Sequence, residues 1–336
     1  MSAIQDTPGR PRGGLSTAGG KVKFAIGLIV TAVLVWAIAQ QVDGARMLAA
    51  VRGLPAWALG AAALCLVADF LAKIARWRSM LTLLSPAVTW AASGQSLLAS
   101  IALNNLLPLR AGDVARAFAF RGALGVGPSS IVPLLVLERL LDTAALLVLA
   151  ALAMFPLART GSLPHELWFM PYLCIAVFVG APIGIATFVL GMRVFRHRYW
   201  ALGLSKTAEA ALDTVEGQLD SGHVVRLVGL TAIAWVFEAG IFCALAVGFG
   251  FSQPLLAGAL ACALATLSGL IPSAPGAIGT FHAAALAAVT LFGADASQGA
   301  AFAVVAHAFL WLPLTALGAL CLPFLSATSP PLKEHA

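Results

Sequence analysis

Residues 129–155 read SSIVPLLVLERLLDTAALLVLAALAMF, an apolar run with Glu138, Arg139 and Asp142 near its middle. A helix needs about 20 predominantly apolar residues to cross the hydrocarbon core of a bilayer, so this stretch predicts a membrane-spanning helix. Comparable apolar runs occupy residues 24–41, 54–75, 168–191, 224–249 and 298–325. The sequence therefore predicts an all-α polytopic membrane protein with about six full spans.

The composition of the whole chain agrees with this fold class. Of 336 residues, 60% are hydrophobic and only 10% are charged, whereas a soluble globular chain carries about 25% charged residues. This argues against soluble enzymes, nucleic-acid-binding proteins and disordered proteins. The net charge of +6 does not point to nucleic acid, because Lys and Arg in membrane proteins mainly mark the side of the bilayer that a loop occupies.

The basic residues also predict an orientation in the plasma membrane. With the N-terminus in the cytoplasm, 16 of the 20 Lys and Arg residues fall on the cytoplasmic side, Lys73, Arg76, Arg110 and Arg116 among them. This bias follows the positive-inside rule and places both termini in the cytoplasm. Residues 37–39 (AIA) resemble a signal-peptide cleavage site, but further spans follow at once, and we expect an uncleaved first helix.

The domain organisation is expected to be simple. Residues 1–20 are predicted to form a disordered cytoplasmic tail, residues 21–326 a single transmembrane domain, and residues 327–336 a short cytoplasmic tail. Within the domain, residues 192–223 form the longest loop. Apolar and charged residues alternate there with helical periodicity, which predicts a cytoplasmic amphipathic linker helix with an acidic polar face.

Two regions do not fit a straight span, namely residues 88–121, which contain NNLLPLRAGDVARAF, and residues 254–293, which contain IPSAPGAIG. Proline interrupts helical hydrogen bonding and glycine permits tight turns. We predict a re-entrant hairpin in each region, and residues 254–293 could alternatively cross the membrane twice, giving eight spans in all. The breaks are assigned to Pro108, Gly112, Pro272, Pro275, Gly276 and Gly279, with helices restarting near Asp113 and Ala277.

The two broken regions suggest an inverted repeat. Residues 107–112 (LPLRAG) align with residues 271–276 (IPSAPG), and three predicted spans separate the copies, so the copies enter from opposite sides. Paired, Gly/Pro-interrupted segments of inverted orientation mark the binding region of a transporter. Restarting helices would present free N–H groups suited to an anion such as phosphate. The alternative is two unrelated proline-kinked helices.

Four charges lie within predicted spans: Glu138, Arg139, Asp142 and Glu238. Each costs about 2.5–3.5 kcal/mol at the centre of a membrane helix unless it pairs or meets water. Glu138 and Asp142 share a helical face, and Arg139 can reach Asp142 at a spacing of three residues. Either the four residues belong to an ion-pair network that joins helices, or they line a polar path for a headgroup.

The first broken region concentrates polar side chains around the break. Asn104 precedes the candidate headgroup-binding residues Asn105, Arg110, Asp113 and Arg116. Arginine is suited to bidentate contact with phosphate. Alternatively, the two arginines determine topology and reach toward the lipid surface. Farther back, the second span ends with a possible Asp69–Lys73 pair at a spacing of four residues and with Arg76-Trp77-Arg78.

His282 and His307 lie in the last two apolar segments and are assigned to the same polar path. An isolated intramembrane histidine is most often a hydrogen-bonded packing residue, and a metal site would need a ligand beyond these two. The five cysteines lie in apolar runs without metal-ligand spacing, which indicates packing residues. We predict no metal and no cofactor.

These residues, in this order and spacing, resemble the flippase-like membrane family related to the transmembrane region of lysylphosphatidylglycerol synthase. The resemblance covers residues 20–325 and is carried by Arg76-Trp77-Arg78, residues 105–116 (NLLPLRAGDVAR), Glu138-Arg139-x-x-Asp142, Trp235-x-x-Glu238 and Pro272-x-x-Pro275-Gly276-x-x-Gly279. The family often has Gly, Glu and Arg where this chain has Ala277, His282 and His307. The last two departures indicate that one interacting pair has replaced another.

The resemblance implies lipid translocation, or a supporting role in lipid-linked glycan and aminoacyl-lipid pathways. Bifunctional members carry a soluble aminoacyl-transferase domain after the membrane part. Only residues 326–336 follow the last predicted span here, so we expect no enzyme activity of that kind. The leading hypothesis is a transporter that moves an anionic lipid or lipid-linked precursor between leaflets. The alternatives are a non-catalytic partner of a membrane glycosyltransferase and, less favoured, an intramembrane lipid-phosphate enzyme.

Overall fold

The computed structural model describes residues 18–108, 110–180, 213–218 and 220–327. The regular structure in these ranges is helical, without strands. The main helices are α1 (Ala18–Ala39), α2 (Gly44–Arg52), α3 (Ala56–Thr82), α4 (Trp90–Leu106), α5 (Ala111–Phe118), α6 (Arg121–Leu124), α7 (Pro128–Arg159), α11 (Ser221–Gly248), α12 (Pro254–Leu267), α13 (Thr280–Thr290) and α14 (Ala296–Ala327). Short 3-10 turns are η1 (His165–Leu167), η2 (Ser268–Leu270) and η3 (Pro275–Ala277).

The predicted spans are confirmed for four long helices, α3, α7, α11 and α14, which are long and apolar enough to cross a membrane. The first predicted span corresponds to α1, whose apolar part qualifies as a fifth span only together with α2, across a bend of 87°. The predicted span 168–191 is described only to Gly180, within an apolar helix. Of the predicted tails at 1–20 and 327–336, residues 1–17 and 328–336 lie outside the described residues, as does most of the linker at 192–223. Residues 18–20 are not a tail but the start of α1, and residue 327 is the end of α14.

The outer surface of the bundle is apolar, as expected for a protein in contact with lipid. Leu64 on α3, Val225 on α11 and Leu320 on α14 each expose about 70% of their surface (75%, 73% and 69%). In contrast, buried positions include several charged residues. The chain is therefore a multi-pass membrane protein whose polar groups face inward.

The two broken regions form short helices that meet inside the bundle. Helices α4 and α5 have 17 and 8 residues, and α12 and α13 have 14 and 11. At 1.5 Å per residue the longest of these rises about 26 Å, less than the core thickness of about 30 Å. Residues 254–293 therefore form a re-entrant hairpin and not two full crossings.

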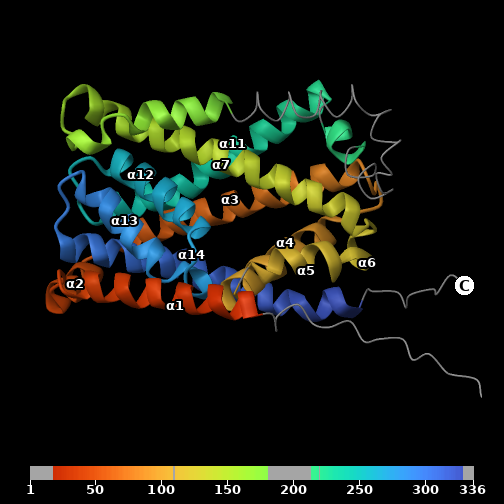
Figure 1. Cartoon of the computed structure of the whole chain (residues 1–336), viewed down its shortest axis with the longest axis horizontal. Helices are drawn as coiled ribbons and strands as arrows, with labels where there is room; N and C mark the ends of the chain where they lie inside the picture. Colours follow the sequence, from red (N-terminus) through yellow and green to blue (C-terminus); the bar gives the residue numbers. More distant parts are fainter. Residues whose placement is uncertain (1–17, 109, 181–212, 219, 328–336) are drawn as a thin grey trace, which may run out of the picture.

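The two hairpins approach each other from opposite ends of the bundle (Figure 1). Helices α12 and α13 lie toward one end and α4 and α5 toward the other, and their tips meet near the middle. The Nη2 atom of Arg110 in the first tip donates to the carbonyl of Gly269 in the second, at 3.1 Å. This arrangement agrees with the inverted orientation expected of the repeat.

The turn in the first hairpin differs from the prediction. Arg110, and not Gly112, adopts the left-handed conformation (φ 54°, ψ 44°), and α5 begins at Ala111 rather than near Asp113. Gly112 is needed for a different reason, because a Cβ atom there would lie 1.8 Å from the Ser100 carbonyl oxygen. The absence of a side chain lets α5 pack directly against α4.

The second hairpin uses its glycines as predicted. Gly276 and Gly279 have positive φ values of 72° and 90°, which side chains rarely tolerate. Ala277 between them also has a positive φ, of 56°, although it carries a side chain. Helix α13 begins at Thr280, later than the predicted restart near Ala277, because η3 occupies residues 275–277.

Small residues hold the hairpins against the spans. A Cβ atom on Gly258 of α12 would lie 2.7 Å from the backbone of Cys243 in α11. A Cβ atom on Gly318 of α14 would lie 2.1 Å from the Leu98 carbonyl oxygen in α4. Such backbone-to-backbone contact is how membrane helices gain packing energy where lipid supplies no hydrophobic driving force.

Candidate functional site: a charged cavity between the hairpin tips

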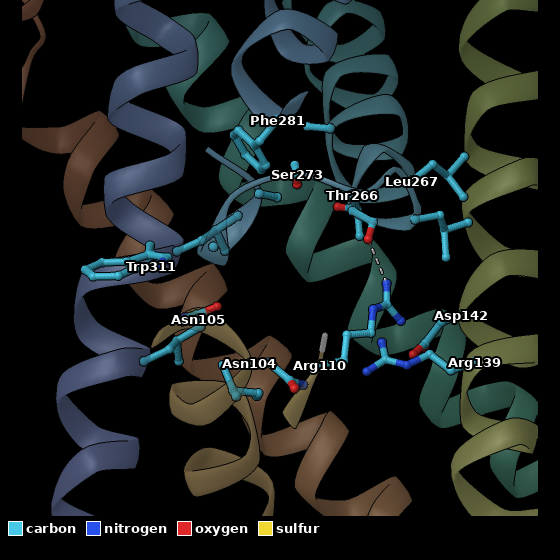
Figure 2. Close-up of a pocket in the computed structure, with 18 of the residues that line it drawn as sticks. Asn104, Asn105, Arg110, Arg139, Asp142, Thr266, Leu267, Ser273, Phe281 and Trp311 are labelled. Atoms are coloured by element: carbon cyan, nitrogen blue, oxygen red, sulfur yellow. Dashed lines mark hydrogen bonds between the residues drawn. The ribbon is translucent and has the colours of Figure 1, made fainter. Parts of the chain in front are cut away.

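A cavity of about 650 Å³ lies where the two hairpin tips meet the spans. Figure 2 shows its walls, with Asn104 and Asn105 from α4, Arg139 and Asp142 from α7, Phe281 from α13 and Trp311 from α14. The charged residues among its lining are Lys73, Arg76, Arg110, Arg116, Glu138, Arg139, Asp142 and Glu238. The cavity thus contains most of the residues that the sequence assigned to headgroup binding and to the polar path.

Arg116 is bound within the wall of the cavity. Its two terminal nitrogens donate to the two carboxylate oxygens of Glu138, at 3.1 and 3.2 Å, and its guanidinium lies 4.6 Å from the ring centre of Trp77. The residue is only 1% exposed. Arg116 therefore joins α5 to α7 and α3, and the guanidinium that the sequence assigned to headgroup binding is paired with Glu138 in this structure.

Asp113 and Arg139 form the next pair. Arg139 Nη2 donates to Asp113 Oδ2 at 3.0 Å, which links α7 to the start of α5. The expected pairing of Arg139 with Asp142 is wrong, because Asp142 binds partners on other helices. Its Oδ1 accepts from Arg76 Nη1 at 2.6 Å and from Trp235 Nε1 at 3.0 Å.

Lys73 and Arg76 line the cavity, although the sequence analysis did not assign them to the site. They were counted among cytoplasmic orientation markers, yet α3 continues to Thr82 and both side chains line the cavity. Arg76 is 2% exposed. The signal that could have located them is their spacing, since Asp69, Lys73 and Arg76 recur at intervals of four and three on one helical face.

The predicted Asp69–Lys73 pair forms, with Lys73 Nζ donating to Asp69 Oδ2 at 2.9 Å. Lys73 also donates to Glu238 Oε2 of α11. The ammonium lies 5.3 Å from the Phe70 ring centre and 5.2 Å from that of Trp235. One ammonium is therefore shared by two carboxylates from different helices.

The start of α5 is closed to an external anion. Asn104 Oδ1 accepts from the backbone N–H groups of Gly112 and Asp113, at 2.8 and 3.3 Å. These are the donors that the restarting helix was expected to offer to a phosphate, so that expectation is wrong for the first hairpin. Asn105 has a comparable structural contact, since its Nδ2 donates to Thr315 Oγ1 of α14 at 2.8 Å.

Arg110 differs from the other cations of the cavity. Its Nη2 donates to the Gly269 carbonyl, and the dashed line in Figure 2 marks this contact. Among the basic residues that line the cavity in the described part of the chain, Arg110 alone has no carboxylate within ion-pair distance. Its positive charge is therefore not balanced by a direct ion pair.

His282 and His307 lie against each other at the second hairpin, with ring centres 4.7 Å apart. His307 Nε2 donates to the Gly276 carbonyl at 2.9 Å, and His282 Nδ1 accepts from the Gly279 N–H at 3.4 Å. Both contacts hold the glycine turn in place. Within the described ranges no three His, Cys, Asp or Glu side chains are grouped as a metal site would require.

Comparison with protein families identifies the membrane domain. A family model described as the lysylphosphatidylglycerol synthase TM region matches residues 24–318. The chain belongs to this family. The matched range includes both hairpins and all the charged residues of the cavity. None of the curated proteins compared with the chain matches it significantly.

The histidine pair joins α13 to α14 of this lysylphosphatidylglycerol synthase TM family member through contact of the two imidazole rings. The second hairpin therefore lines the cavity without a charged residue of its own, and the cations come from α3, α7 and the first hairpin.

Proposed function

We propose that this protein moves an anionic lipid or lipid-linked precursor between the two leaflets of the plasma membrane, with both termini in the cytoplasm. The observation that carries the proposal is Arg110, a cation without a carboxylate partner inside a cavity enclosed by two opposed hairpins. A phosphate group supplies the negative charge and the acceptor oxygens that this guanidinium lacks. The protein acts as a carrier in this proposal and not as an enzyme.

The apolar rim of the cavity supports a lipid as the ligand. Leu107, Leu270 and Ile271 line the cavity and are 43%, 61% and 52% exposed at the hairpin tips. They offer apolar surface to acyl chains while the headgroup occupies the charged interior. A soluble phosphate compound would gain nothing from this surface, whereas a lipid would gain about 25 cal/mol for each Å² of apolar area buried.

The contacts between the tips suggest how the cavity opens. Arg110 holds the Gly269 carbonyl, and a Cβ atom on Gly276 would lie 3.4 Å from the Asn105 carbonyl oxygen. A headgroup that binds Arg110 competes with the Gly269 carbonyl and loosens this closure. Alternating opening on the two sides of the tips is the access mechanism that opposed, broken helices permit in transporters.

The experiment is reconstitution of the purified protein into liposomes that contain fluorescent phosphatidylglycerol, with the leaflet distribution followed by chemical quenching. We expect wild-type protein to accelerate exchange and Arg110→Gln to slow it at least about tenfold, because a hydrogen bond to a charged group contributes about 1.5–3 kcal/mol. Arg110→Lys keeps the charge and should retain part of the activity.

The matched control is Arg121→Gln, which removes an exposed cation on α6 and should leave exchange unchanged. Folded wild-type protein that exchanges no labelled anionic lipid would contradict the proposal, as would an Arg110→Gln variant with wild-type rates. Lipid movement that appears only when a membrane glycosyltransferase is added would instead favour the supporting role.

A further inference from the structure

The cluster of Asp69, Lys73 and Glu238, hereafter the α3–α11 triad, contains two carboxylates for one ammonium. Lys73 Nζ donates to Asp69 Oδ2 at 2.9 Å and also to Glu238 Oε2. Asp69 is 0% exposed and Glu238 is 5% exposed. With all three groups ionised, the triad therefore holds one negative charge in excess within the membrane domain.

The two carboxylates of the triad are not equally satisfied. Both oxygens of Glu238 have partners, since Thr266 Oγ1 of α12 donates to its Oε1 at 3.4 Å. Asp69 Oδ1 is buried and has no hydrogen-bond partner among the residues that the structure describes. An unpaired carboxylate oxygen of this kind is costly, because burial removes its water without supplying a donor.

The surrounding helices do not supply the missing positive charge. On α3, Arg76 is committed to Asp142 of α7, at 2.6 Å. Asp142 itself is a further carboxylate near Asp69 and adds no positive charge. Cys262 of α12 and Cys243 of α11 also lie near the triad and are uncharged as thiols. Arg116 and Arg139 form ion pairs with Glu138 and Asp113 elsewhere in the cavity wall, so their positive charges are already balanced. Arg110, the remaining cation of the cavity, donates to the Gly269 carbonyl and forms no ion pair with Asp69 or Glu238. The excess negative charge of the triad therefore has no direct ion-pair partner outside the triad.

We propose that the α3–α11 triad binds one proton, on Asp69 Oδ1, and that this proton is the ion coupled to lipid movement. The proton comes from water and adds to a lone pair of the carboxylate, so that one O–H bond forms and the charge of the triad changes from −1 to zero. Lys73 remains an ammonium and keeps both of its contacts. The orphan oxygen becomes an uncharged hydroxyl, which costs less to bury without a partner than a carboxylate oxygen, and the buried excess charge disappears.

The position of the triad explains how the proton and the lipid influence each other; this coupling rests on the function proposed above. Lys73 and Glu238 line the cavity, and Asp69 is the member bonded to Lys73 on the same helix. A phosphate in the cavity attracts the shared ammonium and makes the triad more negative, which favours proton uptake. By linkage the proton strengthens lipid binding by the same factor, so the two are bound and carried together.

The site itself is tested by infrared spectroscopy on the protein in lipid nanodiscs. We expect the carbonyl stretch of a protonated, buried carboxyl group in wild-type protein, and its loss in Asp69→Asn. In unsubstituted protein, labelling aspartate with ¹³C at the side-chain carboxyl should shift this band to lower frequency. The label therefore identifies the band as that of an aspartic acid even if Asp69→Asn fails to fold. The control Glu166→Gln, at an exposed residue of η1, should keep the band. A wild-type protein without such a band at any pH at which it is folded would overturn the proposal.

The coupling is tested in proteoliposomes that contain fluorescent phosphatidylglycerol under an imposed pH gradient. Wild-type protein should enrich the lipid in the leaflet that faces the alkaline side, up to about tenfold for each pH unit if one proton accompanies one lipid. Asp69→Asn should exchange lipid without enrichment. Wild-type exchange that ignores the gradient would overturn the coupling and leave the proposed function standing. Absence of any exchange would overturn both, while the infrared result would still decide whether the proton site exists.

Discussion

At the scale of single residues, several buried charged side chains of this protein form ion pairs with residues on other helices. Asp69 and Lys73 do form the pair expected from their spacing, but Lys73 also binds Glu238 of α11. Arg139 binds Asp113 of α5 although Asp142 lies nearby on its own helix. A charge inside a membrane must be satisfied by whatever opposite charge packing brings closest, and helical spacing supplies only one of the possibilities.

The ion pair of Arg116 and Glu138 allows a prediction about stability. Glu138→Gln removes the carboxylate that faces a guanidinium only 1% exposed. We expect the free energy of unfolding to fall by about 3 kcal/mol, the lower end of what breaking a buried pair costs. The Arg116 guanidinium then keeps only its longer contact with Asp113, at 3.4 Å, and Asp113 is already paired with Arg139. Thermal unfolding in detergent measures the loss.

The double variant Arg116→Met, Glu138→Leu tests whether apolar side chains of similar size can replace the ion pair. Replacing both partners with apolar residues should recover much of the loss, since well-packed apolar groups often substitute for a buried ion pair. Glu166→Gln, at an exposed residue of η1, should leave the melting temperature unchanged. Equal stability of wild-type protein and Glu138→Gln would show that the pair contributes little.

At the scale of elements, the hairpins depend on close helix contact as much as on proline. Pro108 and Pro272 lie in the breaks, yet the fold of the first hairpin also requires α5 to touch the backbone of α4. Gly112 permits this contact, and Asn104 completes it by capping the first turn of α5. The turn itself is made by Arg110 in a left-handed conformation.

Gly112→Ala should therefore disrupt the first hairpin. The added methyl would lie 1.8 Å from the Ser100 carbonyl oxygen, so α5 must move away from α4. We expect a destabilisation of about 1–3 kcal/mol, as for overpacking in a protein core, and faster proteolysis near residues 107–118. Gly60→Ala is the control, because a Cβ atom at that position in α3 meets nothing within 4 Å. Equal protease resistance of Gly112→Ala and wild type would argue against the close contact.

At the scale of the whole molecule, the cavity combines a charged interior with an apolar rim. The interior is built from α3, α7, α11 and the first hairpin, and the rim from both hairpin tips. This division suits a ligand with a charged head and apolar tails. It also predicts that the rim acts on lipid movement without acting on headgroup binding.

Ile271→Asn tests the rim. Its side chain is 52% exposed at the second tip, where acyl chains are proposed to pass. A polar amide there should slow lipid movement about tenfold, because contact with acyl chains removes its water without a hydrogen bond in return. Binding of soluble glycerol phosphate should stay unchanged. Leu64→Asn, at a lipid-facing residue of α3 that is 75% exposed, is the matched control. A slower Leu64→Asn and a normal Ile271→Asn would place the path of the acyl chains elsewhere.

The sequence by itself determined the fold class, the positions of the main spans, the two broken regions and four of the charged residues in the membrane domain, Glu138, Arg139, Asp142 and Glu238. These properties depend on the length and hydropathy of local segments and on proline and glycine, which are readable along the chain. Only the tertiary structure decided which charges pair, that α5 is capped by Asn104, that Arg116 is bound, and that Arg110 is left without a carboxylate. The partner of a buried charge is set by distances between helices that are far apart in sequence, and those distances follow from packing.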